Sequence, residues 1–96
     1  MNLKPLCQAC ALGIDIGTSG VRAVAVDGEG RPVAASVFAY QAADDKRIPS
    51  AWWAAVENCL NDLSGKCALG SIEGIAVDGT SGTLVALDAG NAPLGA

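Results

Sequence analysis

A short glycine-rich segment near the N-terminus carries the residue types that bind polyphosphates. Asp15 lies between Gly13 and Gly17, and a Gly-Thr-Ser-Gly turn follows at residues 17–20. Glycines let a backbone approach a ligand closely, and successive N–H groups in a tight turn form a nest for anions. A carboxylate suits Mg²⁺, which prefers oxygen ligands. The pattern would suit a magnesium and polyphosphate site, and a plain hairpin turn beside a solvated aspartate explains it equally well.

Several familiar sites are excluded. The segment lacks the lysine of a P-loop. No Gly-x-Gly-x-x-Gly opens a helix here, so it is not a dinucleotide fingerprint either. The chain contains no histidine, which excludes a histidine metal ligand and a histidine general base.

The elements that would position this segment begin with a β-hairpin. In residues 12–16 the apolar side chains alternate, so that Leu12, Ile14 and Ile16 face one side and Asp15 the other. Residues 21–26 are rich in valine, as a buried strand is. Residues 33–40 form a third extended stretch, and the polar residues 41–49 form a loop. The simplest arrangement is an antiparallel meander of three strands.

Residues 51–63 are predicted to form a helix. Ser50 is the expected N-cap and Gly65 the expected C-cap. We interpret Trp52 and Trp53 as core residues rather than as a platform for a ligand, because they lie on or beside the apolar stripe. The residues of that stripe are Trp53, Val56, Leu60 and Leu63.

A further strand is predicted at residues 72–78, followed by a second Gly-Thr-Ser-Gly sequence at 79–82 and another strand at 83–88. A strand, a helix and a strand in one sheet normally make a right-handed crossover, so the strand at 72–78 should run parallel to that at 12–16. Ligands of open α/β sheets bind at the carboxyl ends of the strands. We therefore expect Asp15 and Asp78, each with its polar loop, to face the same crevice.

Composition sets the remaining bounds. The 96 residues make at most one small domain. The net charge of −4, without a basic cluster, argues against nucleic acid as a ligand. No segment has the length of a membrane span or the pattern of a signal peptide, so we expect no membrane partner and a cytoplasmic location. Cys7 and Cys10 have the spacing of a zinc or redox motif, but no second Cys-x-x-Cys follows, and we interpret them as ordinary reduced thiols.

Together these motifs resemble a known family. Residues 15–27 resemble the first phosphate-binding hairpin of the FGGY carbohydrate kinases, which belong to the actin/hexokinase/Hsp70 superfamily. The tryptophan helix and residues 75–88 are similar to the family's second strand and sugar-facing loop, so the resemblance covers nearly all of residues 12–96. It implies an α/β, ribonuclease H-like N-terminal half-domain made of a three-stranded antiparallel meander, a helix and a parallel strand.

The resemblance also implies a reaction and roles. FGGY kinases transfer the γ-phosphoryl group of Mg-ATP to a sugar hydroxyl, largely by positioning and charge neutralisation. By resemblance Asp15 organises Mg²⁺. The residues implied to bind the ATP phosphates are Gly17, Thr18, Ser19 and Arg22, and those implied to bind the sugar are Asp78, Thr80, Ser81 and Gly82.

The loop at 78–83 is closer to ribulokinase-type members than to the Ser-Gly-Gln-Met-His-Gly of many xylulokinases. This favours a ketopentose, with D-ribulose ahead of D-xylulose. A kinase for glycerol or for a sugar acid such as gluconate is the alternative within the family.

We expect residues 1–11 to be a lead-in tail and residues 12–96 to be an incomplete N-terminal kinase domain. The catalytic aspartate of the family, its second phosphate loop and its adenosine pocket come later in the chain. The resemblance therefore predicts an N-terminal fragment that has no catalytic base and no kinase activity of its own. Two other functions stay open: a non-catalytic nucleotide- or sugar-binding module, and a half-domain that assembles through its exposed sheet edges as a homodimer or with a partner chain.

Overall fold

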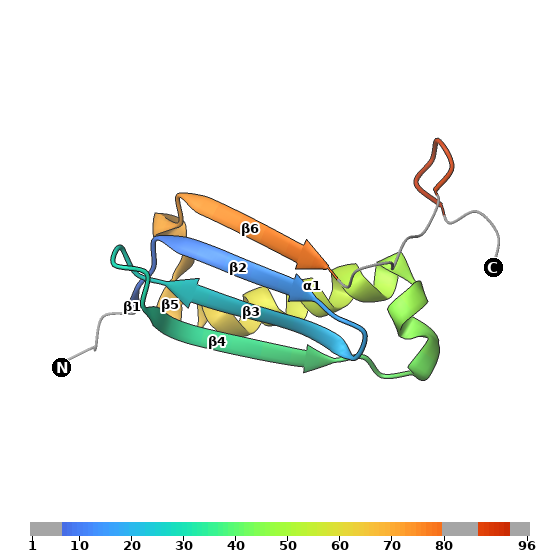
Figure 1. The fold of residues 1–96 in the computed structure, drawn as a ribbon, viewed down its shortest axis with the longest axis horizontal. Coiled ribbons are helices and arrows are strands. Elements are labelled where there is room, and N and C mark those ends of the chain that lie inside the picture. Colours follow the sequence, from blue (N-terminus) through green and yellow to red (C-terminus); the bar gives the residue numbers. More distant parts are fainter. Residues whose placement is uncertain (1–6, 80–86, 93–96) are drawn as a thin grey trace.

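A computed structural model, which describes residues 7–79 and 87–92, contains a four-stranded sheet with one helix on one of its faces (Figure 1). The strands are ordered β4 (Pro32–Ala39), β3 (Gly20–Val26), β2 (Ala11–Ile16) and β6 (Gly74–Gly79). The first three form an antiparallel meander, and β6 pairs with β2 in parallel. The predicted α/β class, with its meander, helix and parallel strand, is confirmed.

Helix α1 (Pro49–Ser64) connects the meander to β6 and packs on β3 and β4. It begins earlier than predicted because Pro49 occupies its first turn, where the missing N–H costs no hydrogen bond. The prediction that Ser50 caps the helix is therefore wrong: Ile48 is the N-cap and makes no side-chain capping bond. The C-cap at Gly65 is confirmed.

The hydrophobic core lies between α1 and the sheet. In β2 the predicted alternation holds, because Leu12 and Ile14 are buried while Asp15 is exposed. In β3, Ala23 and Ala25 are fully buried. The buried core residues are Ala9, Leu12, Ile14, Val21, Ala23, Ala25, Ala55, Val56, Cys59, Leu63 and Cys67. One face of the sheet is thus used for packing, and the opposite face stays open.

The two tryptophans of α1 are less buried than predicted. Trp53 is 63% exposed, so its assignment to the core is wrong. Trp52 is half-buried, and its indole Nε1–H donates to the Lys46 carbonyl at 3.0 Å, in the short helix η1 (Ala43–Arg47). The buried positions of α1 are Ala55, Val56, Cys59 and Leu63. Trp53 lies at the margin of this stripe, where the sheet does not cover it.

Several short elements lie outside the four-stranded sheet. The segment expected to be a lead-in tail contains β1 (Cys7–Gln8), which pairs in parallel with β5 (Cys67–Ala68) after α1. The turn η2 (Leu69–Ser71) follows, and Ser71 Oγ donates to the Ala9 carbonyl at 2.6 Å. The predicted loop at 41–49 contains η1 and the start of α1, whereas the predicted strand at 83–88 lies mainly outside the described residues. Within residues 7–79 and 87–92, no helix is long and apolar enough to cross a membrane.

Candidate functional site

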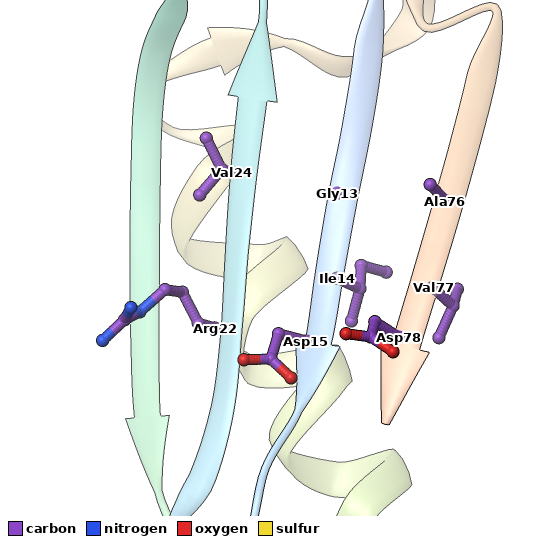
Figure 2. Close-up of a pocket in the computed structure, with 8 residues that line it drawn as sticks. All are labelled: Gly13, Ile14, Asp15, Arg22, Val24, Ala76, Val77 and Asp78. Carbon is purple, nitrogen blue, oxygen red and sulfur yellow. The ribbon is translucent and has the colours of Figure 1, made fainter. Parts of the chain in front are cut away.

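The sheet face opposite α1 brings two carboxylates together. The parallel pairing predicted from the crossover is confirmed, and its register makes Asp15 of β2 and Asp78 of β6 direct partners. Neighbouring strands lie about 4.8 Å apart, and paired residues in parallel register share a face. Figure 2 shows both carboxylates on the same side of the sheet, at the carboxyl ends of their strands. Asp78 also accepts a hydrogen bond from the Gly79 N–H at 3.0 Å.

A shallow depression of about 290 Å³ lies over this face. Small residues make room for it, because Gly13 and Ala76 are partners on the neighbouring strands β2 and β6. Its lining is Gly13, Ile14, Asp15, Arg22, Val24, Ala76, Val77 and Asp78 (Figure 2). The walls are largely apolar, and the charged groups gather at one end.

The hairpin turn between β2 and β3 lines a second depression of about 300 Å³. The turn is closed by the Gly17 N–H, which donates to the Gly20 carbonyl at 2.8 Å. The N–H groups of Thr18 and Ser19, both exposed residues, have no acceptor in the part of the chain that the structure describes. The lining is Asp15, Gly17, Thr18, Ser19, Gly20, Val21, Arg22, Val37 and Ala39. Asp15 and Arg22 therefore border both depressions.

Arg22 lies beside Asp15 in the sheet, but the two side chains form no ion pair. The two are direct partners in the antiparallel ladder. In Figure 2 the guanidinium extends across β4, away from the carboxylate. Among the described residues, arginine and lysine ion pairs form elsewhere, at Arg31 and Lys66. The Arg22 guanidinium is thus available for an anion, to which it offers charge-assisted hydrogen bonds.

Tyr40, just after β4, contacts the turn at two points. Its hydroxyl donates to the Gly17 carbonyl at 3.1 Å, and its N–H donates to the Ser19 carbonyl at 2.9 Å. Burial raises the pKa of the Tyr40 hydroxyl, and the nearby charges of Asp15 and Asp45 raise it further. The hydroxyl therefore stays protonated and acts as a donor. Sequence reasoning missed Tyr40 because a single tyrosine at a strand end carries no motif.

The predicted site residues divide into two groups. Those that the structure brings to the adjoining depressions are Asp15, Gly17, Thr18, Ser19, Arg22 and Asp78. The predicted sugar-binding residues Thr80, Ser81 and Gly82 lie outside the described residues.

The donor set of this face suits magnesium. No cluster of three or more metal-binding side chains occurs among the residues that the structure describes. Mg²⁺ keeps several waters and is usually held by one or two carboxylates together with substrate phosphates. Two neighbouring carboxylates beside unpaired N–H donors and a guanidinium fit that mode of binding.

Comparison with known proteins points to one family of kinases. The model of the FGGY family of carbohydrate kinases, N-terminal domain, matches residues 10–96. Among solved structures, a xyloylose kinase from Brucella ovis is similar with a TM-score of 0.67 and 26% sequence identity. The match covers 85% of this chain and 19% of the solved chain, so the present chain spans about a fifth of the length of that kinase.

Proposed function

The chain belongs to the FGGY family of carbohydrate kinases, and we propose that it forms one wall of a site that transfers a phosphoryl group from Mg-ATP to a ketopentose. The observation that carries the proposal is the in-register pair Asp15 and Asp78, next to a turn whose Thr18 and Ser19 N–H groups have no acceptor among the described residues. We also propose that the protein is located in the cytoplasm. That the chain forms a homodimer stays a prediction.

Each group of the wall has a role in this proposal. The Thr18 and Ser19 N–H groups and the Arg22 guanidinium bind phosphate oxygens and offset their charge. Asp15 holds Mg²⁺, directly or through water, against those phosphates. The ion would neutralise charge that develops on the transferred group. Asp78, one strand further along, is proposed to bind the sugar, and the same role is proposed from the sequence for Thr80, Ser81 and Gly82.

The sugar is proposed to be D-ribulose ahead of D-xylulose. The loop sequence at residues 78–83 resembles that of ribulokinase-type members. The solved relative is described as a xyloylose kinase, which supports a pentose of the same class. Glycerol and gluconate stay as alternatives. A site that hydrogen-bonds sugar hydroxyls discriminates strongly against analogues that lack them.

The proposal is tested by titrating Mg-ATP, and ATP with EDTA, into the chain and into an Asp15→Asn variant by calorimetry. We expect the wild type to bind Mg-ATP more tightly than free ATP, and Asp15→Asn to lose that magnesium-dependent gain. Asp44→Asn removes an exposed carboxylate in η1 and is the matched control, with an unchanged magnesium effect. Equal magnesium dependence in the wild type and Asp15→Asn would contradict the role of Asp15.

A second titration addresses the sugar. D-ribulose, D-xylulose, glycerol and D-gluconate are added separately to the chain in the presence of Mg-ATP, and the Asp78 amide is followed by NMR. We expect D-ribulose to produce the largest response at the lowest concentration. A response to glycerol or gluconate with none to either ketopentose would favour the alternative substrates.

A further inference from the structure

Tyr40 ties the end of β4 to both sides of the hairpin turn. Its hydroxyl donates to the carbonyl of Gly17, which precedes the exposed turn residues Thr18 and Ser19, and its N–H donates to the carbonyl of Ser19, the second of them. Tyr40 and Gly17 are 23 positions apart in the sequence, so the hydroxyl bond is a tertiary contact. The turn is thus held by this contact as well as by the bond from the Gly17 N–H to the Gly20 carbonyl.

The bond to Gly17 also sets the direction of the next N–H. No cis peptide bond occurs in the described residues. In a planar trans peptide the carbonyl of one residue and the N–H of the next point in opposite directions. Since the Gly17 carbonyl points to the Tyr40 hydroxyl, the Thr18 N–H points away from it.

That direction leads toward the second depression. Phe38 and Tyr40 pack against the core, whereas Val37 and Ala39 line the depression on the opposite face. This is the alternation expected of a strand. A carbonyl held from the core side therefore presents the Thr18 N–H on the side where Asp15 and Arg22 lie.

An alternative turn is available to this sequence. In many four-residue turns the first carbonyl accepts a hydrogen bond from the fourth N–H. Here the Gly17 carbonyl makes no such bond with the Gly20 N–H and instead accepts a hydrogen bond from the Tyr40 hydroxyl. Without the hydroxyl, that carbonyl can rotate to bond Gly20, and the Thr18 N–H rotates with it.

We propose that Tyr40 is a positioning residue, which orients the Thr18 N–H for a phosphate of the nucleotide through its bond to the Gly17 carbonyl. This inference rests on the proposed function, because it assigns the turn to phosphate binding. Tyr40 contacts no phosphate itself; it acts through the peptide between Gly17 and Thr18.

The test is an NMR titration of the ¹⁵N-labelled chain with Mg-ATP, which follows the Thr18 and Ser19 amides in the wild type and in Tyr40→Phe. The variant keeps the ring and removes one oxygen. We expect the dissociation constant to rise about two- to twelvefold, the range for loss of one hydrogen bond. The Thr18 amide shift should also change in the unliganded variant, because its peptide reorients.

Ser71→Ala is the matched control, because it also removes a hydroxyl that bonds a backbone carbonyl, at Ala9 and away from the turn. It should lower stability and leave the Mg-ATP dissociation constant unchanged. Equal affinities in the wild type and Tyr40→Phe, with an unchanged Thr18 amide in the free protein, would overturn the role of Tyr40 and leave the proposed function intact. A wild type whose turn amides do not respond to Mg-ATP would overturn the phosphate site itself.

Discussion

Gly20 is the position where a single methyl group should do the most damage to the candidate site. A Cβ built at Gly20 overlaps the Phe38 carbonyl oxygen and lies 2.8 Å from the Ala39 Cα. Both atoms belong to the backbone of β4, which is paired with β3 and cannot rotate away. The two strands must therefore move apart at the end of the sheet that carries Tyr40.

The magnitude follows from two opposing effects. Overpacking of this kind typically costs about 1–3 kcal/mol. Gly20 has no positive φ, so alanine suffers no backbone penalty there and gains about 0.4–1 kcal/mol by restricting the unfolded chain. We expect Gly20→Ala to lower the free energy of unfolding by about 1.5 kcal/mol. In a domain of this size that loss lowers Tm by about 6–12 °C.

The assay is thermal unfolding followed by circular dichroism, with Gly74→Ala as the matched control. Gly74 also lies in a strand, but a Cβ at this position meets no atom within 4 Å. Its replacement should leave Tm unchanged or raise it slightly, because only the unfolded-state effect remains. If the two variants melt at the same temperature, the contact between Gly20 and β4 does not limit stability and the reasoning fails.

Two further predictions concern pH and turnover. The Arg31 N–H, which donates to Asp27 Oδ1 at 2.9 Å, and the Glu29 N–H hold the pKa of Asp27 below its ordinary value of 3.8. The charged carboxylate therefore contributes stability that is present above pH 3.8 and is lost as the pH falls through the lowered value. Urea unfolding should show Asp27→Asn to be less stable than the wild type at pH 6, with the gap closing toward pH 2; a gap that is constant with pH would contradict this. Separately, the 96-residue chain incubated with Mg-ATP and D-ribulose or D-xylulose should release no sugar-dependent ADP in a coupled assay, and sugar-dependent release would show that the chain supplies a catalytic base.

The proximity of Asp15 and Asp78 could be predicted from the sequence because it follows from general rules of sheet structure. The alternation in β2 sets the face on which Asp15 lies, and the handedness of strand–helix–strand connections makes β6 parallel to β2. Both aspartates follow apolar runs of similar length, so the carboxyl ends of the strands bring them together. None of these steps needs knowledge of a particular side-chain contact.

The exposure of Trp53 could not be predicted in this way. Helical periodicity identifies a stripe of apolar residues, but it does not say how far the opposing sheet extends beneath that stripe. The helix packs on β3 and β4, so Trp53 at the margin stays 63% exposed. Ile75 and Val77 of β6 are exposed for the same reason, each at 63%, although both are large apolar side chains. Within the described residues, α1 does not cover β6.

The direction of the N–H groups in the hairpin turn could not be predicted from the sequence, for a different reason. The glycines and hydroxyls at residues 17–20 indicate that donors are available, and this much is local information. Which way the Thr18 N–H points depends on whether the Gly17 carbonyl bonds Gly20 or a group elsewhere in the fold. Tyr40 supplies that group, and its hydroxyl reaches the carbonyl only because β4 pairs with β3 in the observed register. The local sequence thus indicates that the turn has donors for an anion. The orientation of the Thr18 N–H toward Asp15 and Arg22 depends instead on a contact with Tyr40, at the end of β4.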